Sequence, residues 1–306
     1  MNTLPVLIRR EVQEHRGLVI YTPLGLVVFL VAMMLFSFAF SGSSSSVSYT
    51  MTKDGMQSDH RMEVFAPLSS EGLHRFAELP EQKREAWLGK SIVAISVPFL
   101  ILLWTVTFSY LIGTLYGERR DRSILFWKSM PVSDAMTVTS KLLMAVVVLP
   151  VIYFVAIVVA QLIMMLIATV AALVHSVDPW HVLWGQSHLV AHWGALSGWL
   201  ALNAIWYLPA CAWLMLVSSW ARTAPWAWAL AVPVGLVILE KILLPFTWIS
   251  HWISLYSWPL GMPYRVEFHP AMCLPLMFNV QMVVSLAIAA AMIYGAIYMR
   301  GRTDEI

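Results

Sequence analysis

Six runs of apolar residues, each long enough to cross a lipid bilayer, constrain the fold of this chain more than any other feature. A helix needs roughly 20 such residues to span about 30 Å of hydrocarbon. The runs are continuously apolar, which indicates helices, because strands of a membrane barrel alternate polar and apolar side chains. They occupy residues 18–40, 91–115, 142–174, 195–218, 227–244 and 273–299.

The composition agrees with a chain that lies mostly in lipid. Only 12% of the 306 residues are charged, about half the fraction usual in soluble domains. We therefore predict an all-α membrane protein with a single transmembrane domain over residues 1–306. The first run exceeds the length of a signal-peptide core, so we interpret it as a retained span. The third run is longer than one crossing and predicts a tilted helix, a kink near Pro150 or an extension beyond the bilayer.

The distribution of arginine and lysine predicts the orientation of the spans. Cytosolic segments of membrane proteins are enriched in these residues. Six spans place both termini on one side, and we predict that this side is the cytosol of a bacterial cell with the protein in its inner membrane. The net charge of +2 reflects this bias and gives no reason to expect a nucleic-acid partner. The basic residues assigned to the cytosol are Arg9, Arg10, Arg16, Arg119, Arg120, Arg122, Lys128, Lys141, Arg222, Arg300 and Arg302.

Three segments outside the spans have distinct patterns. Residues 2–16 alternate apolar and charged side chains, which is typical of a helix lying on the membrane surface. Residues 41–90 predict a small, partly helical external element, because Leu73, Phe76 and Leu79 recur at helical spacing and Pro80 is suited to open a second short helix. Residues 245–272 are rich in aromatic residues and proline, which favours short helices at the membrane interface. Cys211 and Cys273 fall in or beside spans, and we expect both to pack as small apolar residues.

A short charged segment, residues 117–134, separates the second and third spans. Gly117 is suited to end the incoming helix, and residues 118–128 predict a short transverse helix with a charged side. Pro131 is expected to stop that helix. Ser133 is a good N-cap for the next helix, with Asp134 favourably placed in its first turn. The pattern therefore predicts a span, a short cytosolic helix, a turn and a new helix.

This segment resembles the coupling-helix motif of ABC-type 2 exporter permeases. The motif reads Glu-Arg-x-x-Gly-Ser/Thr, then Leu-Pro-Val-Ser-Arg, then a lysine several residues later. The chain departs from it at Arg122 in place of glycine, at Met130 in place of leucine and at Asp134 in place of a basic residue. The matching residues are Glu118, Arg119, Ser123, Pro131, Val132, Ser133 and Lys141.

The resemblance implies a homodimeric or heterodimeric permease whose coupling helix inserts into a separate ABC ATPase subunit. ATP and magnesium would bind to that partner, and this chain would bind no cofactor and catalyse no reaction. Residues Gly89-Lys90-Ser91 match only the tail of a phosphate-binding loop, because Arg84 stands at its first glycine position. The residues expected to couple the ATPase are Glu118, Arg119, Arg120, Asp121, Arg122, Ser123, Pro131, Ser133 and Lys141.

The cargo is expected to be hydrophobic or amphipathic. Polar and ionisable side chains at membrane depth are candidates for its path, although they also bond neighbouring helices or anchor a helix end. Asn203 and Tyr207 are such candidates in the fourth span, and Glu240 and Lys241 near the outer end of the fifth.

An alternative function is a membrane anchor or assembly factor for an external enzyme, with residues 41–90 as its docking surface and a link to metal-site maturation. His188 and His192 are four residues apart, the spacing of two metal ligands on one helical face. Histidine and tryptophan are also common at membrane interfaces. We therefore predict no metal site.

Overall fold

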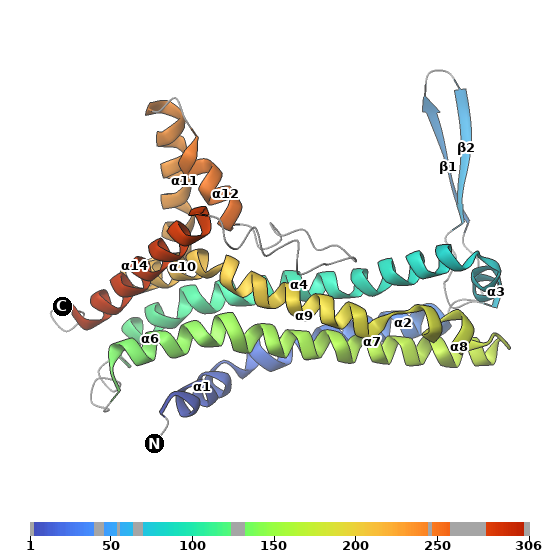
Figure 1. Ribbon diagram of the computed structural model, residues 1–306, viewed down its shortest axis with the longest axis horizontal. Coiled ribbons are helices and arrows are strands. Elements are labelled where there is room, and N and C mark those ends of the chain that lie inside the picture. Colours follow the sequence, from blue (N-terminus) through green and yellow to red (C-terminus); the bar gives the residue numbers. More distant parts are fainter. Residues whose placement is uncertain are drawn as a thin grey trace. The chain divides into compact units, whose positions relative to one another are not determined.

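The structure of the chain is a computed structural model that describes residues 3–39, 46–53, 56–63, 70–123, 132–243, 247–257 and 280–302 (Figure 1). Cys273, Pro131 and the first part of the sixth predicted span lie outside these residues. In chain order the elements are α1 (Thr3–Glu14), a π-helical turn (Gly17–Tyr21), α2 (Thr22–Ala39), β1 (Ser46–Lys53), β2 (Met56–Glu63), α3 (Ser70–Glu78), α4 (Glu81–Arg120), α6 (Asp134–Leu143), a second π-helical turn (Met144–Val148), α7 (Leu149–Val174), α8 (Pro179–Val182), a 3₁₀ turn (Trp184–Gln186), α9 (Leu189–Trp206), α10 (Leu208–Trp220), α11 (Pro225–Leu243), α12 (Trp248–Ser257) and α14 (Val280–Arg302).

Long apolar helices account for most of the described chain. Five are long and apolar enough to cross a membrane, and the bent pair Pro179–Trp206 and Leu208–Trp220 makes a sixth if it forms one span. The protein is therefore a predominantly helical, multi-pass membrane protein, as its sequence predicts. The five are Gly17–Ala39, Glu81–Arg120, Asp134–Val174, Pro225–Leu243 and Val280–Arg302.

Helix α4 is longer than the sequence pattern suggests. Pro80 opens this helix, since its carbonyl accepts hydrogen bonds from the amides of Lys83 and Arg84 at 2.9 and 3.1 Å. The helix then continues for 40 residues, so the helix predicted after Pro80 and the second span are one element. Our expectation that Gly117 ends the incoming helix was wrong. A glycine permits a helix end but does not enforce one, and the amide of Asp121 still bonds the carbonyl of Gly117 at 2.9 Å.

The third span begins at Asp134 and contains a π-helical turn just before Pro150. The amide of Leu149 bonds the carbonyl of Met144, five residues back. Proline has no N–H with which to continue the ordinary pattern, and a π turn is a known adjustment to such a missing bond. A π-helical turn thus lies just before Pro150, where a kink was one of the three alternatives predicted for this long run.

The fourth predicted span is a broken helix. Helices α9 and α10 meet at Tyr207 and are bent by 50°. Pro209, in the first turn of α10, has no amide with which to bond the carbonyl of Ile205. The span predicted over 195–218 is therefore divided between two helices at Tyr207.

Residues 46–53 and 56–63 pair as two antiparallel strands, which we did not predict. Their register pairs Ser46 with Glu63 and Lys53 with Met56. The sequence of β1 alternates small polar residues with Val47, Tyr49 and Met51, a pattern that favours a strand. The helical prediction for this region holds for α3, where the spacing of Leu73 and Phe76 indicated a helix.

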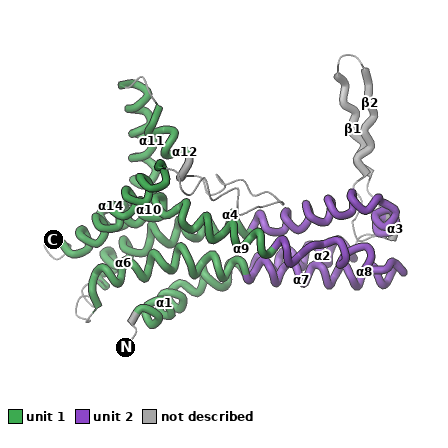
Figure 2. Tube along the Cα trace, in the orientation of Figure 1, with its two compact units in different colours: residues 1–23, 99–154, 193–306 green, residues 24–98, 155–192 purple. Residues whose placement is uncertain are grey.

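The chain divides into two compact units (Figure 2). Unit 1 comprises residues 1–23, 99–154 and 193–306, and in it α14 packs along α10. Unit 2 comprises residues 24–98 and 155–192. In unit 2 the buried amide of Gln161 donates to the carbonyl of Ile92 at 3.1 Å and to Ser96 Oγ at 3.0 Å. In unit 2, these hydrogen bonds connect α7 to α4 within an otherwise apolar helix interface.

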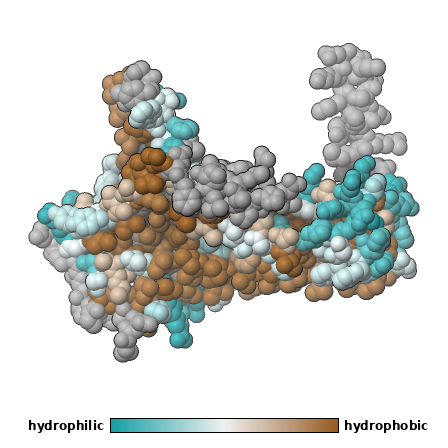
Figure 3. Space-filling model, in the orientation of Figure 1, coloured by the Kyte–Doolittle hydropathy of each residue, from teal (hydrophilic) through white to brown (hydrophobic). Residues whose placement is uncertain are grey.

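Apolar side chains remain exposed on many of the helices. Figure 3 shows hydrophobic residues over α11 and over the visible face of unit 1, whereas hydrophilic residues gather over α3. On α11, Trp226 is 61% exposed and Ile242 is 73% exposed. Such surfaces are unfavourable in water and normal in lipid.

The contact between α10 and α14 can be tested at Gly295. A Cβ atom there would lie 3.2 Å from Leu216 Cδ1, so a branched side chain would force the helices apart. We expect Gly295→Val to destabilise the protein by about 1–3 kcal/mol through overpacking. The measurement is the midpoint of thermal unfolding in a mild detergent.

Gly235→Val is the matched control, because a Cβ atom at Gly235 meets no atom within 4 Å. Equal midpoints for the two variants would contradict the packing of α14 on α10.

Candidate functional site

A buried lysine joins three elements of unit 1 that are distant in sequence. Lys141 lies in α6 and its side chain is only 4% exposed. Its Nζ atom is 2.8 Å from Glu11 Oε1, 3.0 Å from Glu118 Oε1 and 2.8 Å from Thr114 Oγ1. An ammonium group has three hydrogens to donate, and this geometry provides an acceptor for each. Lys141 therefore ties α6 to α1 and α4.

Glu118 continues the cluster to the C-terminal helix. Its second carboxylate oxygen, Oε2, lies 3.1 Å from Nη2 of Arg300 in α14. The other terminal nitrogen of Arg300 pairs with Asp134 at the start of α6. Arg300 is 4% exposed and the Glu118 side chain 10%, so their ion pair is shielded from water, whereas the Asp134 side chain is 30% exposed. Arg300 Nε has no partner in the described residues.

Glu11 completes the cluster from helix α1. Its Oε2 atom accepts a 2.8 Å hydrogen bond from the hydroxyl of Tyr110 and lies 3.8 Å from Nε2 of His15. Burial by itself raises the pKa of this carboxyl group, but the charge and hydrogen bond of Lys141 outweigh burial, and the net pKa lies below its usual value. Glu11 therefore stays ionised at neutral pH. We call Glu11, Glu118, Asp134, Lys141 and Arg300 the ionic cluster.

Contacts to α10 hold the last turns of α4 in place. The Ser218 hydroxyl accepts from the backbone amides of Leu115 and Tyr116 at 3.1 and 3.0 Å, and donates to the carbonyl of Ile112 at 2.7 Å. Arg119 Nη2 donates to the carbonyls of Ser218 and Ala221 at 2.7 and 2.8 Å. A cation suits the C-terminus of a helix, where carbonyl groups lack helical partners.

The residues after Arg119 point outward. Arg120 and Asp121 pair at 3.2 Å, with side chains 68% and 63% exposed. Arg122 is also exposed and has φ of 56°, in the left-handed region that favours glycine. Glycine is the residue that the resembling motif has at this position. The Ser123 hydroxyl bonds back to the carbonyl of Glu118 at 3.4 Å.

Ser133 begins α6 as the sequence predicts. Its side chain accepts a 3.2 Å hydrogen bond from the amide of Met136, which confirms the N-cap. The predicted transverse helix over residues 118–128 does not begin at residue 118, because α4 continues to Arg120. Residues 124–131, including Pro131, lie outside the described residues.

Six of the residues predicted for coupling thus divide into two groups, whereas Ser123 and Ser133 bond locally and Pro131 lies outside the described residues. Glu118, Arg119 and Lys141 are held inside the bundle, whereas Arg120, Asp121 and Arg122 are exposed at its end. Sequence reasoning missed the partners Glu11, Tyr110, Thr114, Ser218 and Arg300. One signal was present: Glu11 stands four residues after Leu7 and three after Ile8, the spacing that places it on the apolar face of this helix. Arg300 was taken for part of the positive-inside bias.

The residues predicted for a cargo path lie in two places within unit 1. Asn203 and Tyr207 line one pocket. Glu240 instead caps α12, because its carboxylate accepts from the backbone amides of Ile249 and Ser250. Trp252 of the same helix donates to Ser285 Oγ of α14 at 2.8 Å. Lys241 is exposed. Glu240 therefore anchors α12 against α11.

The two histidines with metal-ligand spacing have different partners. His188 precedes α9 and pairs with Glu85 at 3.2 Å, whereas Nε2 of His192 lies 3.3 Å from Gln161 Nε2 and 3.4 Å from Ser96 Oγ. Within the described residues, no three histidine, cysteine, aspartate or glutamate side chains come together as metal ligands.

The fold and the site define a multi-pass helical membrane protein with a buried ionic cluster at one end of its longest described apolar helices. No protein-family model matches the chain, and neither characterised proteins nor solved structures gave a significant match.

Lys141→Met tests the role of the cluster in stability. Glu11 would then remain buried without its lysine, and Glu118 would keep only Arg300; breaking a buried ion pair typically costs about 3–5 kcal/mol. We expect a large drop in the unfolding midpoint in detergent, together with loss of protease protection of α1. Lys241→Met is the control, because Lys241 is exposed and its loss should cost less than about 0.5 kcal/mol. Similar midpoints for the two variants would refute the cluster.

The lowered pKa of Glu11 predicts a dependence of stability on pH. The folded state holds the Glu11 carboxylate more strongly than the unfolded state, so its contribution is complete above the unfolded pKa of about 4.5. It is lost as pH falls through the lower folded pKa. We expect the difference in unfolding midpoint between the wild type and Glu11→Gln to be large at pH 6 and to shrink below about pH 4. A constant difference would contradict the assignment.

Proposed function

We propose that this chain is the membrane-spanning subunit of an ATP-driven ABC exporter, and that its motor is a separate ATPase. It would bind no nucleotide itself, and ATP and magnesium would bind to the partner. Two permease copies and two ATPase subunits would form the complete transporter, in a bacterial inner membrane with both termini cytosolic. This proposal combines the resemblance at residues 117–134 with the geometry of the ionic cluster.

The observation that carries the proposal is that the end of α4 is joined to four other helices by buried polar contacts. Glu118 connects α4 to α6 and α14, and Lys141 adds α1. Arg119 and Ser218 add α10. A force applied just beyond Arg120 would therefore act on five helices together, which is the mechanical requirement for a lever moved by a separate motor.

Exposed charges beyond that end suit a docking surface. Arg120, Asp121 and Arg122 are solvent-exposed, and their charges are not consumed by the buried cluster. Complementary charges at a protein interface favour association with the correct partner. In this proposal the buried charges fix the end of α4 to its own bundle, and the exposed charges would contact the ATPase.

A co-purification experiment tests this function. The tagged chain is isolated from its native membrane beside a variant that carries Arg120→Glu, Asp121→Arg and Arg122→Glu. We expect an ATPase subunit with the wild type and at least a tenfold loss of it from the variant. Both preparations should keep the same unfolding midpoint, because the altered side chains are exposed.

The matched control exchanges the exposed pair of α1, Arg10→Glu with Glu14→Arg, which keeps an ion pair at the same helical spacing. This variant should retain the ATPase. If no ATPase accompanies the wild type in several mild detergents, the transporter assignment fails. An external protein captured through residues 41–90 would then favour the anchor or assembly-factor function.

A further inference from the structure

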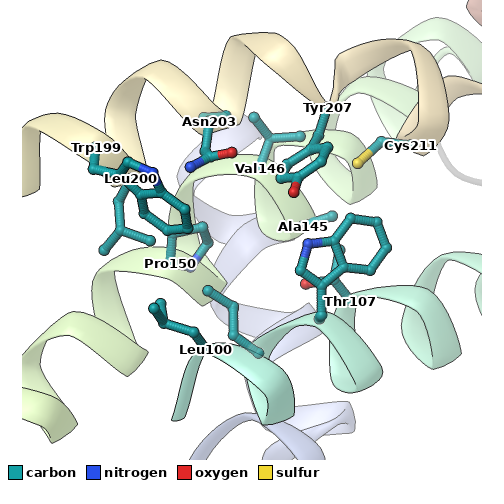
Figure 4. A pocket seen from close by; sticks show the side chains of 13 residues that line it. Leu100, Thr107, Ala145, Val146, Pro150, Trp199, Leu200, Asn203, Tyr207 and Cys211 are labelled. Carbon is teal, nitrogen blue, oxygen red and sulfur yellow. The ribbon is translucent and has the colours of Figure 1, made fainter. Parts of the chain in front are cut away.

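The break between α9 and α10 lies beside a pocket within unit 1. The pocket is lined by residues of α4, of α9 and α10, and of the segment around Pro150, and its cavity volume is about 50 Å³. Figure 4 shows Asn203 and Tyr207 reaching into it from one side, opposite Leu100 and Thr107 of α4. Irregular backbone at membrane depth persists only where protein covers it or where it lines a cavity. The broken helix therefore has a cavity at its break.

The polar groups of this pocket lack protein partners. Asn203 is 4% exposed, and neither its amide nitrogen nor its amide oxygen has a hydrogen-bond partner within the described residues. Tyr207 is 8% exposed and its hydroxyl is likewise unpaired. Its ring packs edge-on against Trp104, with centroids 4.9 Å apart. An unpaired buried amide or hydroxyl is costly, so protein interiors rarely contain one. Here three such atoms face one cavity.

The lining also restricts the chemistry of an occupant. Apart from Asn203, Tyr207, Thr107 and Cys211, the lining residues are apolar or aromatic, and the described lining includes no charged side chain. A charged head would therefore lose its hydration without gaining a counter-charge. A neutral hydroxyl or carbonyl, in contrast, can bond the amide and the phenol at once. The apolar walls suit a hydrocarbon body.

The volume of the cavity limits how much of a bound molecule can enter it. About 50 Å³ accommodates a few atoms, and it is well below the roughly 150 Å³ of an engineered cavity that holds benzene. Trp104 and Pro150 of the lining are half-buried, so the pocket is not fully enclosed and the rest of a longer molecule can stay outside it. The ligand that fits is one whose polar head enters while its apolar chain remains outside.

We propose that the Asn203–Tyr207 pocket binds the head of a neutral, hydroxyl-bearing amphiphile that enters from the lipid phase. If the exporter function holds, this pocket is a cargo subsite and the cargo class is a neutral lipid alcohol. The binding itself rests only on the pocket, and it is measured on the chain without any ATPase. Failure of binding and failure of ATPase association are therefore separate results.

The test is photo-crosslinking of the intact chain in phosphatidylcholine nanodiscs. The probe is hexadecanol with a diazirine near its hydroxyl end, and cross-linked peptides are mapped by mass spectrometry. We expect saturable labelling of peptides from α9 and α4, with competition by unlabelled hexadecanol. Probes with the same chain but a carboxylate, an ammonium or no head group should label these peptides at least tenfold less.

Variants separate a binding role from a packing role. Asn203→Leu and Tyr207→Phe should each reduce labelling about tenfold, the effect of one lost hydrogen bond. Asn203→Leu should also raise the unfolding midpoint when no alcohol is present, since it removes an unpaired buried amide. Ala145→Leu, which adds bulk to the cavity wall and leaves Asn203 and Tyr207 in the sequence, should block labelling as well.

The opposite pattern would overturn the proposal. If wild type and Asn203→Leu are labelled equally, or if the headless probe labels as well as the alcohol, the pocket does not recognise a hydroxyl head. If wild type shows no saturable labelling and Asn203→Leu lowers the unfolding midpoint, the two polar side chains only hold internal water.

Discussion

The ammonium group of Lys141, held between Glu11 and Glu118, is the interaction on which unit 1 depends. It brings a helix from the start of the chain beside helices that follow more than a hundred residues later. Lys141 has an acceptor for each of its hydrogens, and this is what makes a buried charge tolerable. The cost of removing one partner is high because the remaining charges cannot reach water.

The rest of the cluster extends this constraint along α4. Glu118 is shared between Lys141 and Arg300, so α6 and α14 are fixed through one carboxylate. About one turn before Glu118, the Ser218 hydroxyl of α10 accepts a hydrogen bond from the amide of Leu115 and donates one to the carbonyl of Ile112. The result is a helix whose final turns are rigidly oriented, followed at once by exposed charges. The last turns of α4 are thus held in place by buried contacts, and the residues that follow Arg119 are accessible at the surface.

The pocket at the α9–α10 break differs from the ionic cluster in how many of its buried polar atoms have hydrogen-bond partners. In the ionic cluster nearly every polar atom has a partner, whereas Asn203 and Tyr207 have none among the described residues. Native proteins keep such groups where a ligand or water supplies the missing bond. Unit 1 therefore combines an ionic cluster whose charges are paired with a pocket whose polar groups lack partners among the described residues.

The sequence by itself determined the class of the protein and the approximate position of its helices. Continuous apolar runs of this length have one favourable environment, and local chemistry placed Ser133 at a helix start and a helix over Leu73 and Phe76. The paired strands β1 and β2 were not predicted, because β2 has no alternating apolar pattern to indicate a strand. The tertiary structure alone decided that Gly117 continues a helix, that Glu11 is buried and that Arg300 is an internal partner. Sequence patterns report the preferences of neighbouring residues, whereas these outcomes depend on charges brought together from distant parts of the chain.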